Sequence, residues 1–125
     1  MNTAQRFNRI YIGDSVIERI ELNLSTAQCN VILDRAILLR EGSPPNIFDP
    51  AVKYEPACLT FKGLQSIYCP EGKFYLNNTI VNFGAEALGE DLVEFSLEVT
   101  GGYDNETFMR SLVFVALDFS LSSAE

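Results

Sequence analysis

The chain has no histidine and no tryptophan among its 125 residues, and it has only three cysteines. Without histidine it lacks the side chain that most often exchanges protons near neutral pH and the commonest nitrogen ligand of zinc and haem. The longest uncharged, largely apolar run is Ser111–Leu117, far short of the roughly 20 residues that a membrane-spanning helix needs. We therefore expect no membrane span and no histidine-dependent catalysis.

The three cysteines are too few and too widely spaced for a redox pair or a zinc knuckle. Cys29, Cys58 and Cys69 lie at least 11 positions apart, so no CxxC motif is present. Each lies in an apolar stretch, where cysteine usually packs as a small buried hydrophobe. The segment Met1–Arg9 has no apolar core of the kind that secretory signals contain. We therefore predict buried, reduced thiols and a cytoplasmic protein.

Basic residues become scarce after Lys73. Up to that residue, eight lysines and arginines balance eight acidic residues, whereas from Phe74 onward nine acidic residues face Arg110 alone. The whole net charge of −8 therefore belongs to the C-terminal part. Such a surface repels phosphate backbones and attracts basic proteins, although acidic residues also serve solubility. The residues expected to form a partner-binding acidic surface are Glu86, Glu90, Asp91, Glu94, Asp104 and Glu106.

Apolar and polar residues alternate along most of the chain, which is the period of a half-buried strand. In the stretch Gln28–Arg40 the apolar face changes near Asp34 and Arg35, which predicts either a β-bulge or burial of both faces there. Gly42–Pro56 is rich in proline and is expected to be irregular, and Gly84–Asp91 is expected to hold a helical turn. Strands are predicted at about Arg19–Leu24, Gln28–Arg40, Ala57–Phe61, Leu64–Cys69, Phe74–Phe83, Val93–Val99 and Thr107–Leu121, and a helix at about Thr3–Asn8, capped by Asn2 or Thr3.

These elements predict one domain over residues 1–125 that is mainly β. The expected architecture is an antiparallel β-sandwich or flattened barrel of about eight strands with a short N-terminal helix.

The last two long strands allow a prediction of register. We expect Met109, Val113 and Val115 to share the core face with the apolar residues of Val93–Val99. In an antiparallel pair the numbers of two facing residues add up to a constant, the index sum, and this arrangement makes it 208. Glu98 would then face Arg110 on the outer side of the sheet. The opposite face of Thr107–Leu121 is also apolar, so we expect either Gly42–Pro56 or a second subunit to cover it, and we favour a homodimer.

Four stretches of the sequence also carry a resemblance to a known family. Ile10–Asp14, Leu59–Ile67, Pro70–Gly72 and Tyr75–Ile80 resemble, in this order, one family of small bacterial β-rich domains of unknown function. The likeness runs from about Ile10 to Phe119 and rests on turns and strand edges. It implies a β-rich domain loosely similar to immunity-type proteins of bacterial toxin systems, and it transfers no activity and no functional residue.

The function expected from these observations is that of a non-catalytic, cytoplasmic protein-interaction domain, immunity-like or regulatory, with a basic protein as its partner. A small-molecule-binding β-sandwich walled by Gly42–Pro56 is the alternative, and an enzyme using carboxylates comes third. No catalytic, cofactor-binding or metal-binding residues are predicted. Serine and cysteine have no histidine base, no glycine-rich phosphate loop is present, and Asp104-Asn105-Glu106 does not follow the order of a calcium loop.

Overall fold

A computed structural model describes residues 1–38, 54–89, 91–101 and 108–124. The described elements are one helix, α1 (Thr3–Phe7), and eight strands: β1 (Ile17–Asn23), β2 (Gln28–Ile37), β3 (Tyr54–Lys62), β4 (Ser66–Tyr68), β5 (Thr79–Ala87), β6 (Val93–Gly101), β7 (Phe108–Ala116) and β8 (Asp118–Ser123). The predicted mainly β fold of about eight strands with a short N-terminal helix is confirmed.

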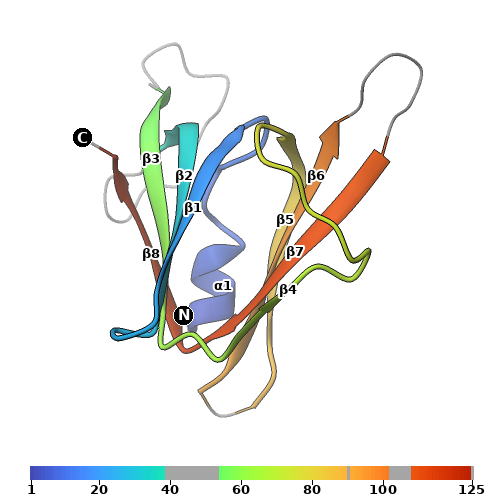
Figure 1. Cartoon of the computed structure of the whole chain (residues 1–125). Helices are drawn as coiled ribbons and strands as arrows, with labels where there is room; N and C mark the ends of the chain where they lie inside the picture. The colour runs from blue at the N-terminus through green and yellow to red at the C-terminus, as the bar shows by residue number, and fades with distance from the viewer. Residues whose placement is uncertain (39–53, 90, 102–107, 125) are drawn as a thin grey trace.

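The strands form two antiparallel four-stranded sheets that face each other (Figure 1). The first sheet has the order β1-β2-β3-β8 and the second has the order β4-β7-β6-β5. The arrangement is thus a two-sheet sandwich rather than a closed barrel. Alternation along the central strands fills the space between the sheets, and Val31, Leu59, Phe61, Leu97 and Phe114 are fully buried there.

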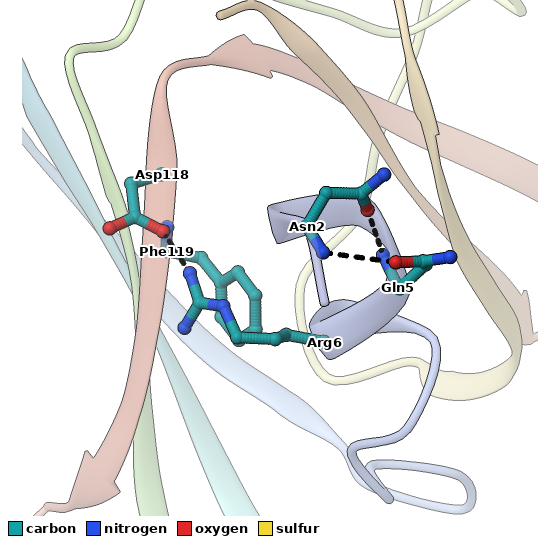
Figure 2. A network of polar contacts seen from close by, with 5 residues as sticks. All are labelled: Asn2, Gln5, Arg6, Asp118 and Phe119. Carbon is teal, nitrogen blue, oxygen red and sulfur yellow. Dashed lines mark hydrogen bonds and ion pairs between the residues drawn. The ribbon is translucent and has the colours of Figure 1, made fainter.

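Helix α1 lies between the two sheets (Figure 1). The side chain of Asn2 accepts a hydrogen bond from the Gln5 backbone, and the Gln5 side chain accepts one from the Asn2 backbone (Figure 2). This capping box confirms Asn2 as the N-cap and satisfies two of the free donors of a helix too short to be stable alone.

Phe7 fastens the helix to both sheets. Its fully buried ring contacts the rings of Phe61 and Phe119 from the first sheet and of Phe83 and Phe95 from the second, at centroid distances between 4.9 and 6.3 Å. Arg6 adds an ion pair of 2.5 Å with Asp118 at the start of β8, and its guanidinium lies 5.0 Å from the ring centroid of Phe119 (Figure 2).

The chain passes from one sheet to the other at a corner near Gly63 and Leu117. β3 belongs to the first sheet and β4 to the second, while β7 and β8 make the reverse passage. The N–H of Leu117 donates to the carbonyl of Lys62 at 3.0 Å, so the two passages are bonded together. The single strand predicted over Thr107–Leu121 is therefore wrong, because the chain changes sheet between Ala116 and Asp118.

Two further local predictions have opposite outcomes. The bulge expected near Asp34 is confirmed, since the pairing of β2 with β3 shifts between Leu33 and Ala36. The helical turn expected over Gly84–Asp91 is wrong, because β5 continues to Ala87 and the turn follows it. Polar residues are tolerated in this stretch because β5 is an edge strand with one face toward solvent.

The predicted register of β6 and β7 is also wrong. Val99 faces Arg110 and Glu98 faces Ser111, an index sum of 209, so Glu98 and Arg110 lie on opposite faces of the sheet. β7 turns Leu112, Phe114 and Ala116 toward the core, where the Phe114 ring stacks on Phe61 at 4.1 Å.

Arg110 is accommodated on the core-facing row because it lies near the end of the strand. Its guanidinium packs 5.1 Å from the ring centroid of Phe108 and donates to the carbonyl of Met109.

Candidate functional site: an acidic groove on the second sheet

The outer face of the second sheet carries polar residues in ordered rows. In one row Glu86 of β5 faces Glu94 of β6, and in another Asn82 faces Glu98, which in turn faces Ser111 of β7. The row between them contains Gly84, Ser96, Val113 and Tyr68. Strict alternation in β6 directs Glu94, Ser96 and Glu98 outward, because the residues between them are buried in the core.

This face is hollowed into an open groove of about 460 Å³. The hollow follows from the small residues of the middle row, since Gly84 has no side chain and Ser96 a short one. Val113 lies in the groove with only 5% of its surface exposed, although it points away from the sandwich core. The groove therefore combines an apolar patch with polar margins, and the other lining residues include Tyr68, Pro70, Phe83, Ala85 and Ser111.

Three carboxylates line the groove, and none of its lining residues is basic. Glu86 and Glu94 are direct neighbours across adjacent strands, an arrangement that is unfavourable for like charges. Glu98 follows on the same face of β6, two residues after Glu94. Within the described residues no ion pair involves any of the three. The groove therefore presents concentrated negative charge that the described part of the chain does not neutralise.

A fourth carboxylate, Glu71, borders the same face from the turn after β4. Its Oε2 accepts a hydrogen bond of 3.0 Å from the backbone N–H of Ser111 and contacts the Cys69 thiol at 3.5 Å. The hydrogen bond from Ser111 lowers the pKa of the Glu71 carboxyl below its usual value. Glu71 thus completes the edge of β7 where the short strand β4 no longer covers it.

The predicted acidic residues are only partly brought together. Glu86 and Glu94 line the groove, whereas Asp91 is exposed in the turn between β5 and β6 and does not line it. Glu90, Asp104 and Glu106 lie outside the described residues. Most of the predicted loop Gly42–Pro56 also lies outside them, although its last three residues open β3.

Glu98 and Val113 belong to this site, although the sequence analysis did not assign them to it. The alternation of β6 did indicate that Glu98 shares a face with Glu94, but the mistaken register assigned Glu98 to Arg110. Val113 was placed in the core, whereas the structure places it on the outer face, beside Tyr68 of β4. The homodimer expected from the sequence stays a prediction.

The carboxylates in the lining make the groove attractive to cationic groups. The hydroxyl groups in its lining belong to Tyr68, Ser96 and Ser111, and the chain has no histidine to act as their base. Within the described residues, no three acidic or cysteine side chains are grouped closely enough to hold a metal ion. The described helix is also far too short to cross a membrane.

Comparison of the chain with protein-family models, with curated proteins and with solved structures finds no match.

Proposed function

We propose that the domain is a protein-interaction module whose acidic groove binds a basic segment of a partner protein. The observation that carries the proposal is the set of three carboxylates, Glu86, Glu94 and Glu98, along a groove that has no basic lining residue. A lysine or arginine placed there would relieve the repulsion between Glu86 and Glu94. Its aliphatic stem could pack on Val113 while its charged end reaches the carboxylates.

The open shape of the groove favours a segment of chain, whereas its volume fits either kind of ligand. A volume of about 460 Å³ is toward the lower end of the roughly 300–1,000 Å³ typical of ligand pockets. Because the groove is open along the sheet, an extended segment can lie in it without the sheet having to move. A small cationic ligand would use the same carboxylates, and it is the alternative that the following experiment separates.

The test measures binding of a fluorescent ten-residue peptide of alternating lysine and alanine by anisotropy, with free lysine as the small-cation probe. Glu98→Gln is compared with Glu18→Gln, which removes the same charge from an exposed site on β1 of the other sheet. We expect Glu98→Gln to weaken peptide binding about fivefold, the effect of losing about 1 kcal/mol, and Glu18→Gln to change it less than twofold.

Equal losses in the two variants would show that the peptide responds only to net charge and would contradict the groove. Tight binding of free lysine in place of the peptide would support the small-ligand alternative. The resemblance to immunity-type proteins and the cytoplasmic location remain predictions.

A further inference from the structure

The edges of the second sheet are protected by side chains. On β5, the Asn8 side chain accepts a hydrogen bond from the Ala85 N–H and donates one to the Ala85 carbonyl, at 2.8 and 3.1 Å. Near the start of the same strand, Ile80 exchanges backbone hydrogen bonds with Asp14 and Ser15. At the other edge lies β4, a strand of only three residues, and beyond it Glu71 bonds to the edge of β7. Such devices prevent an edge from pairing with another chain.

On β1 of the first sheet, the first residue of the strand is bonded in the same way. Ile17 donates to the carbonyl of Asn78 and accepts from the N–H of Asn77. The register then shifts between Ile17 and Arg19, which marks a bulge. Beyond the bulge, the hydrogen bonds among β2, β3 and β8 determine in which direction the backbone N–H and C=O groups of β1 point.

Backbone hydrogen bonds along a strand alternate between its two neighbours. Ala124 donates to the carbonyl of Pro56, so the even-numbered residues of β3 bond to β8 and the odd-numbered ones to β2. Leu59 therefore bonds to Val31, which then cannot bond to β1.

Ile20 faces Val31 and Leu22 faces Cys29 across β1. The backbone groups of Ile20 and Leu22 accordingly point away from the sheet, and within the described residues nothing bonds to them.

The side chains on this open edge are apolar on the inner face. Leu22 is 50% exposed and Leu24, in the turn after β1, is 81% exposed, while Ile20 packs against the core. The outer face of the same strand carries the ion pair of Arg19 with Glu21. The edge therefore offers the free backbone groups of Ile20 and Leu22 and the N–H of Leu24, whose carbonyl accepts a hydrogen bond of 3.3 Å from Ala27. It also offers apolar side chains beside the sandwich interior.

We propose that this edge pairs with a second copy of the chain, antiparallel about a two-fold axis at Leu22. Leu22 would face Leu22 of the partner subunit, and Ile20 would face Leu24 of the partner subunit, an index sum of 44. Glu21 would then face Asn23 of the partner subunit. The two first sheets would join into one, and the exposed leucines would be buried.

Two neighbouring registers are less favourable. A sum of 42 would set Glu21 opposite Glu21 of the partner subunit, and like charges directly opposite are destabilising. A sum of 40 would bring the partner's turn to the outward groups of Ile17, which Asn77 and Asn78 already occupy. Charge also favours this edge, because the residues up to Lys73 are balanced and the excess of acidic residues lies in the later part of the chain.

The experiment compares the wild type with Leu22→Glu and Leu88→Glu by sedimentation equilibrium across 1 to about 200 micromolar. Leu88 is a matched control, since it is 52% exposed and lies just beyond β5 on the other sheet. We expect the wild type to approach twice the monomer mass of 13.9 kDa, and Leu88→Glu to behave like it. Leu22→Glu should weaken the dimer at least about 100-fold, the effect of losing two buried leucines.

Circular dichroism and melting curves show whether both variants fold. A wild type that stays monomeric at the highest concentration would overturn the proposal, and so would folded Leu22→Glu that dimerises as the wild type does. The register is tested by measuring disulfide-linked dimers after mild oxidation of Leu22→Cys and Glu21→Cys. The wild type, which has three cysteines, gives the background. Covalent dimers of Leu22→Cys support the axis at Leu22, whereas a stronger reaction of Glu21→Cys would refute it.

Discussion

At the scale of single residues, the three thiols differ in their surroundings more than their sequence contexts suggest. Cys29 is fully buried, whereas Cys58 and Cys69 are only half-buried. The prediction of burial is therefore right for Cys29 and wrong for Cys58 and Cys69, of which Cys69 lies beyond the end of β4. Burial raises the pKa of the Cys29 thiol to about 11, with a smaller contribution from Cys58.

This difference predicts two classes of thiol. In native protein near neutral pH, a thiol reagent should label Cys29 far more slowly than the other two, because its thiol is buried and protonated. The slow class should disappear in Cys29→Ala and persist in Cys69→Ala. Because the folded state favours the neutral form of the Cys29 thiol, protonation of this thiol contributes to the stability of the folded state. The contribution is complete below pH of about 8.5 and is lost as the pH rises toward 11. Rapid labelling of all three thiols in buffer would rule the assignment out.

Glu71 gives a second prediction at this scale, with the opposite pH dependence. Its pKa is lowered by the hydrogen bond from Ser111, so its ionised form stabilises the folded state. That contribution is complete above the unfolded pKa of about 4.3 and is lost as the pH falls through the lower folded value. The melting temperatures of wild type and Glu71→Gln should differ at pH 6 and converge toward pH 3. A constant difference over this range, or the same convergence in Glu18→Gln, would contradict the role of Glu71.

At the scale of elements, the corner between the sheets depends on Gly63. Its φ of +63° lies in the left-handed region, and a Cβ there would lie 2.6 Å from Cδ1 of Leu117. Gly63→Ala should lower the free energy of unfolding by about 2–3 kcal/mol, the sum of backbone strain and overpacking. Leu117→Ala should cost little alone, because Leu117 is exposed, and should recover part of the loss in the double variant. Strictly additive effects in urea denaturation would show that the two residues do not compete for space.

The elements also show how far the sequence determines the fold. Alternation in Val93–Val99 and the change of face near Asp34 predicted a strand and a bulge correctly, because both are local consequences of one buried face. The register of β6 and β7 was wrong because both faces of β7 are apolar, so alternation could not identify the core face. The packing of Phe114 on Phe61 decides it, and Phe61 is distant in sequence.

The candidate site was predictable only where its residues follow one another on a strand. Glu94 and Glu86 were selected from charge alone, and the alternation of β6 adds Glu98. A strand was predicted over Leu64–Cys69, which contains β4, but its pairing with β7 could not be predicted, because the two strands are distant in sequence. The pairing of Glu71 with Ser111 depends on a turn that brings together residues 40 positions apart.

At the scale of the whole molecule, the two sheets carry different surfaces. The outer face of the first sheet has mixed polar groups, such as the hydrogen-bonded Thr60 and Asn30, and an open edge at β1. The outer face of the second sheet carries the carboxylates of the groove, and its edges are protected by Asn8 and Glu71. The proposed self-association uses the first sheet and the proposed recognition of a basic partner uses the second, so the two activities can be tested independently.

The most direct test of the central claim is a nuclear magnetic resonance titration of isotope-labelled protein with the lysine–alanine peptide. If the groove binds a basic segment, the largest and saturable amide shifts will fall on Gly84, Ser96 and Val113, which line it from three strands. The amides of Asn30 and Thr60 on the first sheet will move little. Shifts spread evenly over both sheets, or concentrated on the first, would contradict the assignment of the acidic groove as the binding site.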